Sequence, residues 1–193
     1  QQSRTWKPPY GFTRFNWDLS NMVGPSPRWG RWETAPLSDS DKELCNKALW
    51  KAMDVVMKVP RTQQTWGLIH ADLRPSNVIK GPDGKLTIID FDDAGYSWYL
   101  YDYASSLSFI EHEPYAPDLA KAWVEGYQNV AGEFTGDELK MMSALSMIRR
   151  LQMLGWTTNH RADALPDGMA AEEAPGSVMC AARYLADPLW LLH

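Results

Sequence analysis

The segment between residues 77 and 90 constrains the fold of this chain more than any other. Two short β-rich runs, Val78–Lys80 and Lys85–Ile89, flank residues 81–84, whose Gly-Pro-Asp-Gly sequence favours a tight turn. Such a hairpin brings its two ends side by side. Asn77 enters the first run and Asp90 leaves the second, so an antiparallel register places both polar side chains in one small volume.

The chemistry of this polar pair indicates a site for a hard cation. Mg²⁺ prefers oxygen ligands and usually combines one or two carboxylates with phosphate oxygens and water. A pair of protein ligands with open positions therefore favours a metal–nucleotide complex over a closed structural site. The alternative is structural, with Asn77 in an Asx turn, Asp90 capping a strand end and Asp72 stabilising a turn.

Two motifs in fixed order surround the hairpin. Residues 70–77 read H-A-D-L-R-P-S-N and residues 89–93 read I-D-F-D-D. They resemble the protein-kinase catalytic loop, H-R-D-L-x-x-x-N, and the D-F-G that follows it. Ala71 replaces the Arg and Asp92 replaces the Gly, and with these departures the segment is more similar to the aminoglycoside phosphotransferase and choline kinase family. The run at 101–104, Y-D-Y-A, resembles the D-L-A of that family, with Tyr103 in place of Leu.

The resemblance implies a fold, a reaction and cofactors. The fold would be α+β and mainly α-helical, the C-terminal lobe of a protein-kinase-like fold with a small β-hairpin carrying the catalytic and metal motifs. The reaction would be transfer of the γ-phosphate of ATP to a hydroxyl of a small molecule, with Mg²⁺ present. Asp72 would be the catalytic residue, and Asn77 and Asp90 the metal ligands. His70 and Asp102 would support the catalytic loop.

Three further residues carry open alternatives. Ile79 and Ile89 either form the floor beneath the adenine, as cofactor-binding residues, or pack as hairpin core. Arg74 either reaches a phosphate or the acceptor, or forms a surface ion pair.

Acidic residues follow the second motif. Asp92 and Asp93 are candidates for binding a cationic acceptor, such as an aminosugar or a quaternary amine. Glu111 and Glu113 either extend this acidic rim or lie on a solvated loop face.

Composition excludes several classes of partner. The chain has 193 residues, of which 45% are hydrophobic, and a formal net charge of −5. This charge favours neither nucleic acid nor an anionic membrane, and no apolar run reaches the length of about 18 residues that a membrane span needs. Cys45 and Cys180 lack metal-site spacing and make no disulfide framework, which fits a reducing cytoplasm.

The chain is predicted to form one lobe over residues 1–193. Residues 1–36 form an irregular entry segment with a short helix near 16–22, residues 37–66 a helix, residues 67–95 the motif region and residues 96–193 a helical bundle. The expected helices span about 39–58, 104–110, 116–130, 137–157 and 176–186. Ser40 and Thr135 are predicted to open two of these helices as capping boxes.

The resemblance also implies a second, β-rich lobe with a phosphate loop and a strand Lys, for which residues before Gly67 show no pattern. We therefore expect an N-terminal lobe to be absent, and this chain to be inactive by itself. The surface that would meet that lobe is expected to be apolar and to allow a homodimer. The alternatives are a non-catalytic lobe used for binding or assembly, and a kinase that acts on protein Ser/Thr.

Overall fold

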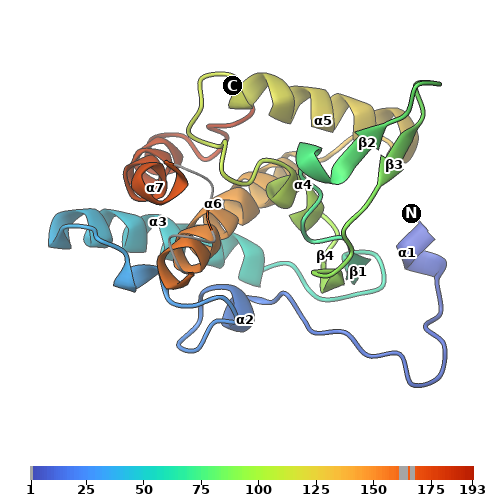
Figure 1. Cartoon of the computed structure of the whole chain (residues 1–193), viewed down its shortest axis with the longest axis horizontal. Coiled ribbons are helices and arrows are strands. Elements are labelled where there is room, and N and C mark those ends of the chain that lie inside the picture. Colours follow the sequence, from blue (N-terminus) through green and yellow to red (C-terminus); the bar gives the residue numbers. More distant parts are fainter. Residues whose placement is uncertain (1, 161–164, 166–167) are drawn as a thin grey trace.

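The computed structural model of the chain describes residues 2–160, 165 and 168–193 (Figure 1). It is mainly helical, with two small antiparallel sheets, as the sequence predicts for an α+β lobe. The helices are α1 (Gln2–Thr5), α2 (Leu19–Val23), α3 (Asp39–Met57), α4 (Tyr101–Ser106), α5 (Ala116–Ala131), α6 (Gly136–Asn159) and α7 (Met169–Ala186). The strands are β1 (Trp66–Ile69), β2 (Val78–Lys80), β3 (Leu86–Ile88) and β4 (Gly95–Trp98), and the two 3₁₀ turns are η1 (Trp32–Thr34) and η2 (Pro75–Asn77).

Helix α6 runs through the middle of the core and contacts α2, α3, α4 and α7 (Figure 1). Every residue from 141 to 155 is buried, so the helix has no solvent-facing stripe over this length. A helix that is enclosed on all sides is normally apolar all round. Arg149 and Arg150 are the two charged residues in this stretch, and both have to find partners inside the protein.

Both strands of one sheet lie, in sequence, between the two strands of the other. Strands β1 and β4 pair antiparallel, with Ile69 opposite Gly95, and the β2–β3 hairpin lies between them in sequence. The loop that leaves β1 and the segment that returns to β4 therefore start and end at neighbouring positions. The predicted hairpin is confirmed, with a turn whose Gly84 has a φ of 79°. The β1–β4 pairing was not predicted.

Several predicted helix boundaries are corrected. Ser38, not Ser40, caps α3, because its hydroxyl accepts a bond of 3.1 Å from the backbone N of Asp41. The capping box of Thr135 is confirmed. Helix α4 ends at Ser106, before the predicted end at residue 110, and α7 begins at Met169, ahead of the predicted start at about residue 176, and passes through Pro175.

The short helix predicted near residues 16–22 is α2, capped by Asp18, whose carboxylate accepts a bond of 3.0 Å from the backbone N of Asn21. Just before it, Asn16 forms a parallel bridge with Tyr96 of β4, which attaches the entry segment to the sheet. Over the described part of the chain, no helix combines the length and the apolar character needed to cross a membrane.

Candidate active site

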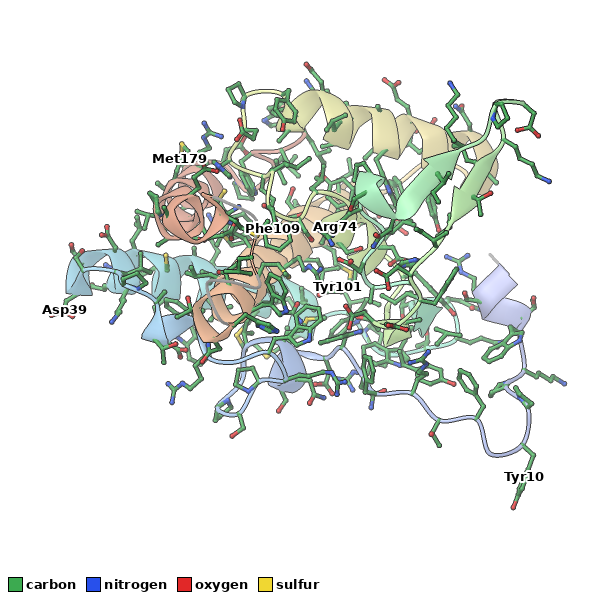
Figure 2. The ribbon with its side chains drawn as sticks, in the orientation of Figure 1. Tyr10, Asp39, Arg74, Tyr101, Phe109 and Met179 are labelled. Atoms are coloured by element: carbon green, nitrogen blue, oxygen red, sulfur yellow. The ribbon has the colours of Figure 1, made fainter. Side chains whose placement is uncertain are left out.

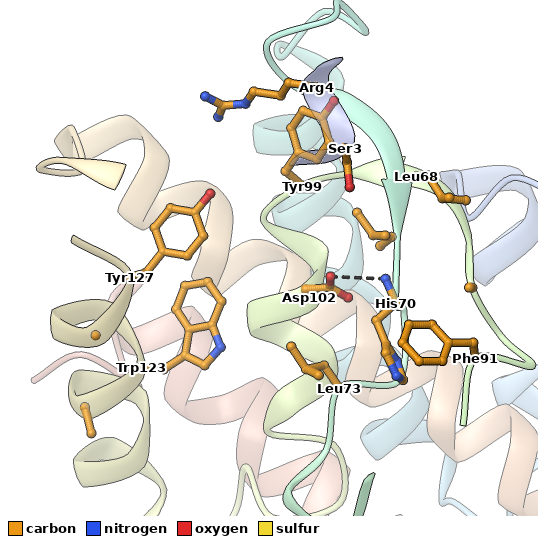
Figure 3. Close-up of a pocket in the computed structure, with 14 residues that line it drawn as sticks. Ser3, Arg4, Leu68, His70, Leu73, Phe91, Tyr99, Asp102, Trp123 and Tyr127 are labelled. Atoms are coloured by element: carbon orange, nitrogen blue, oxygen red, sulfur yellow. Dashed lines mark hydrogen bonds between the residues drawn. The ribbon is translucent and has the colours of Figure 1, made fainter. Parts of the chain in front are cut away.

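One carboxylate on α4 holds the loop that leaves β1. Asp102 Oδ2 accepts a bond of 3.2 Å from the backbone N of His70, and its Oδ1 accepts one of 2.7 Å from the backbone N of Ala71 (Figure 3). Ala71 has a φ of 65°, a left-handed conformation that L-residues rarely adopt. Burial raises the pKa of Asp102, and the two backbone bonds oppose this rise. Asp102 thus fixes a strained turn immediately before Asp72.

The imidazole of His70 joins the two motifs. Its Nδ1 accepts a bond of 3.3 Å from the backbone N of Asp72, so Nε2 carries the hydrogen and donates to the backbone O of Ile89 at 2.9 Å. The ring also packs against Phe91, with 4.7 Å between ring centroids. The catalytic loop and the segment after β3 are thereby tied to each other.

The carboxylate of Asp72 is buried and held from three directions. Its Oδ1 accepts bonds from Arg149 Nη2 at 2.9 Å and Arg74 Nε at 3.1 Å, and its Oδ2 accepts one from Asn77 Nδ2 at 2.9 Å. Arg74, for which the sequence left two alternatives open, pairs with Asp72 itself in this structure. This set of donors leaves the carboxylate little freedom to rotate.

Arg149 is a site residue that the sequence analysis did not find. It is completely buried on α6, and it also donates to Tyr101 Oη at 2.9 Å and Ser108 Oγ at 2.8 Å. Burial alone would lower the pKa of Arg149, but Tyr101 and Asp72 raise it above the ordinary value. Burial raises the pKa of Tyr101 to about 12. The sequence does contain one signal for a buried site residue, namely a pair of arginines inside an otherwise uncharged stretch of helix.

The hairpin brings the two predicted metal ligands to the same end. Asn77 accepts a backbone bond of 3.0 Å from Ile89 N, so Asp90 directly follows the residue opposite Asn77. The amide nitrogen of Asn77 donates to Asp72, which leaves its oxygen, Oδ1, as the atom available to a cation. Asp90 is exposed and has a φ of 64°.

These donors suit a hard cation such as Mg²⁺ that takes its remaining ligands from phosphate and water. Within residues 2–160, 165 and 168–193, no group of three or more His, Cys, Asp or Glu side chains could hold a metal ion by itself.

The two acids after the second motif lie in different surroundings. Asp92 is exposed, and its backbone O accepts a bond of 3.2 Å from Arg14. Asp93 is half-buried, and burial raises the pKa of its carboxyl group, with Arg149 opposing the rise and Asp72 adding to it. The carboxylate of Asp93 is therefore close enough to Arg149 and Asp72 to interact with their charges, whereas Asp92 is exposed to solvent.

For three other residues the structure excludes at least one of the alternatives considered. Ile79 and Ile89 are 52% and 37% exposed, so neither is hairpin core. Glu111 belongs to neither an acidic rim nor a solvated face, because it is completely buried and pairs with Arg150 at 2.9 Å. A sequence pattern cannot show this, since the partner lies on a distant helix.

Two apolar cavities border the other side of the catalytic loop. One, of about 580 Å³, is lined by His70, Tyr99, Trp123 and Tyr127 among others (Figure 3). A second, of about 490 Å³, lies between the hairpin and α5 and shares Leu73 and Trp123 with the first. Neither is lined by Asp72, so the cavities lie toward α5 and the polar site lies toward α6.

This chain is similar in sequence and in structure to known kinases. Amicoumacin kinase from Bacillus subtilis (strain 168) is 31% identical to this chain over 105 residues, which are 53% of this chain and 31% of that protein. A solved structure of a microcompartment-associated aminopropanol kinase is 33% identical, with a TM-score of 0.86, and the match covers 100% of this chain and 60% of that chain. This chain therefore spans less than two thirds of either relative.

A second solved structure shares the fold. Amicoumacin kinase hAmiN, solved in complex with AMP-PNP, Ca²⁺ and Ami, is 18% identical with a TM-score of 0.64, covering 93% of this chain and 54% of that chain. Both structural relatives are kinases, so the fold is kinase-like. The model of the phosphotransferase enzyme family matches residues 7–141. With that match, over more than half of its length, the chain belongs to the phosphotransferase enzyme family.

Proposed function

We propose that this chain is the catalytic and acceptor-binding part of an ATP-dependent phosphotransferase that moves the γ-phosphate to a hydroxyl of a small molecule. The observation that carries the proposal is the buried Asp72 carboxylate, oriented by Arg74, Arg149 and Asn77. Phosphoryl transfer passes through a largely dissociative transition state, so it needs positioning more than a strong base. A carboxylate held this firmly is suited to align the acceptor hydroxyl and to take its proton late.

The other site residues have roles that follow from their positions. Asn77 Oδ1 and Asp90 would hold Mg²⁺, which offsets negative charge on the phosphates when it is bound. His70 and Asp102 keep the loop around Asp72 in its strained turn. Ile79 and Ile89, exposed on the hairpin, would lie under the adenine.

The acceptor that fits best is a small amino alcohol. Asp93 is half-buried and its charge interacts with that of Asp72. We propose that its carboxylate pairs with an ammonium group of the acceptor while Asp72 binds the hydroxyl. The aminopropanol kinase relative, 33% identical over the whole of this chain, is named for such a compound.

Exposed apolar side chains support a second, compatible role in assembly. On the hairpin, Leu86 and Ile88 lie on one face and Ile79 on the other, and Ile89 and Phe91 follow β3. Exposed apolar side chains that gather in this way mark contact surfaces. We propose that the hairpin and the segment after it pack against a further lobe in the complete enzyme, and that the isolated chain self-associates through the same residues.

The function is tested in a full-length phosphotransferase that contains these 193 residues. With Mg-ATP and 1-amino-2-propanol, Asp72→Asn should lower kcat by about 10² to 10⁴-fold, the usual cost of losing a positioned acid or base, with nucleotide binding preserved. Asp90→Asn should change the dependence of the rate on Mg²⁺. Asp118→Asn, an exposed acid at the start of α5, is the matched control. Wild-type turnover in the Asp72 variant would remove this residue from the mechanism.

The class of acceptor is tested by comparing the amino alcohol with a diol and with a peptide. Propane-1,2-diol lacks the amine, and a Ser-containing peptide tests the protein-kinase alternative. Asp93→Asn should raise the KM of the amino alcohol and leave the KM of ATP unchanged. Equal use of the diol and the amino alcohol would contradict the assignment of Asp93.

A further inference from the structure

The turns between α4 and α5 contain a further non-glycine residue with a positive φ close to the site. Phe109 has a φ of 74°, which for a bulky aromatic residue is a genuine outlier. Figure 2 shows it beside Arg74, near Tyr101. Strained backbone of this kind persists only where the surrounding structure fixes it, and such residues cluster at functional sites.

Two buried arginines fix the backbone on either side of Phe109. Arg149 Nε donates to Ser108 Oγ at 2.8 Å, and Arg150 Nη1 donates to Glu111 Oε2 at 2.9 Å. Ser108 and Glu111 are themselves buried. The segment is therefore anchored to α6 by a hydrogen bond on each side of Phe109.

The ring of Phe109 lies next to the group that holds Asp72. The guanidinium carbon of Arg74 is 5.3 Å from the centroid of the ring, and Arg74 Nε bonds to both carboxylate oxygens of Asp72, at 3.1 and 3.2 Å. The ring also contacts Trp156, with 5.9 Å between centroids, and both rings are half-buried. Two aromatic rings thus pack together next to Arg74, which holds the catalytic carboxylate.

We propose that Phe109 is a specificity-determining residue that packs against the hydrocarbon part of the acceptor. The inference rests on the proposed function, in which Asp72 binds the acceptor hydroxyl. A carbon substituent beside that hydroxyl then meets the Phe109 ring, backed by Trp156, while the amine lies toward Asp93. The preferred acceptor is an amino alcohol with a methyl or similar branch next to the hydroxyl.

Two acceptors that differ by one methyl group test this. In the full-length phosphotransferase, kcat/KM for 1-amino-2-propanol should exceed that for 2-aminoethanol by about 10-fold or more, the usual discrimination for one carbon in an apolar pocket. Phe109→Gly removes the ring and accepts the positive φ, and Phe109→Ala removes the ring and keeps the strain. Both should bring the ratio close to one and leave the KM of ATP unchanged.

Further variants separate the possible outcomes. Phe109→Leu, which keeps an apolar side chain, should retain part of the preference even if a smaller residue does not fold. Tyr115→Ala, an exposed aromatic in the same connection, should retain all of it. A wild-type enzyme that phosphorylates neither amino alcohol refutes the proposed function. An active wild type without the methyl preference, or folded variants that keep it, overturns the role of Phe109 alone.

Discussion

Arg149 and Arg150 are neighbours on α6 and both are completely buried, but they lie in surroundings of different charge. Arg149 pairs with one carboxylate, Asp72, and donates to two hydroxyl groups. Arg150 pairs with two carboxylates, Glu111 at 2.9 Å and Glu173 at 3.3 Å. The first cluster reaches the candidate active site, and the second joins α6 and α7 to the connection before α5.

The charge balance of the two clusters indicates what each does. Burial raises the pKa of Glu173 to about 8, Arg150 opposes the rise and Glu111 adds to it. Glu173 therefore carries a proton at neutral pH, and the second cluster becomes one cation paired with one anion. Glu111 Oε1 and Glu173 Oε2 are buried with no hydrogen-bond partner in the described part of the protein. We infer that the Arg150 cluster is structural, whereas the Arg149 cluster serves the reaction.

Removing Arg150 should cost the most stability. Arg150→Met leaves the charge of Glu111 buried without a cation, which typically costs about 3–5 kcal/mol. Arg183→Met, an exposed arginine on α7, is the control and should change the free energy of unfolding by less than about 0.5 kcal/mol. Urea unfolding of the isolated chain measures both. A loss below about 1 kcal/mol for Arg150→Met would contradict the structural role assigned to Arg150.

Removing Arg149 should mainly affect catalysis. Asp72 keeps Arg74 and Asn77, so no buried charge is left alone, but the carboxylate loses the donor that ties it to α6. In the full-length enzyme, Arg149→Met should lower kcat by about 10²-fold, as misplacement by 1 Å can do, without changing the KM of ATP. Arg149→Lys should rescue only part of the rate, because an ammonium group cannot reach three partners at once. If kcat were unchanged while stability fell, Arg149 would be merely structural.

The raised pKa of Glu173 predicts a dependence of stability on pH. The carboxyl group binds a proton more tightly in the folded chain than in the unfolded one, so its stabilising effect is complete below pH 4.5 and is lost as the pH rises toward about 8. The slope in this window should reach about 1.4 kcal/mol per pH unit. Glu173→Gln, which cannot ionise, should flatten it. Urea unfolding at several pH values measures the slope, and identical slopes in both proteins would contradict the assigned proton.

Two serines offer the smallest and most closely matched test. Arg149 Nε donates to Ser108 at 2.8 Å, and Arg150 Nε donates to Ser177 at 2.9 Å. Each hydroxyl also donates to a backbone O, Ser108 to that of Ser105 at 2.8 Å and Ser177 to that of Glu173 at 2.7 Å. Ser108→Ala and Ser177→Ala therefore each remove two hydrogen bonds and should each cost about 1–3 kcal/mol in unfolding experiments, at about 0.5–1.5 kcal/mol per bond. Only Ser108→Ala should also lower kcat. An equal effect of both on the rate would show that the two clusters do not differ in function.

The parts that sequence predicted correctly are those set by neighbours along the chain. The hairpin follows from β-rich runs around a Gly-Pro-Asp-Gly turn, and its register brings Asn77 and Asp90 to one end. The capping box at Thr135 is equally local. Arg149, by contrast, meets Asp72 across 77 positions of sequence, and periodicity carries no information about such a contact.

Two further misses have the same physical origin. Glu111 looked like a surface acid because its partner, Arg150, lies on α6. Helix α7 continues through Pro175, although proline normally breaks a helix interior. The helix packs against α3 and α6, and such tertiary packing is not part of the helix propensity of a sequence. Tertiary contacts determine both the burial of Glu111 and the extent of α7.

Because α6 is enclosed by the rest of the lobe, different parts of the site should unfold locally at different rates. Amide hydrogens between residues 141 and 155 have no local route to solvent, so they should exchange with deuterium only when the whole lobe unfolds. The exposed strands β2 and β3 can open alone and should exchange much sooner. Asp72 is bonded through Arg149 to α6, the part of the lobe that should open most slowly. Asn77 and Asp90 lie at the end of the hairpin, which should open much sooner. Loss of metal binding should therefore precede loss of acceptor alignment as the protein is heated.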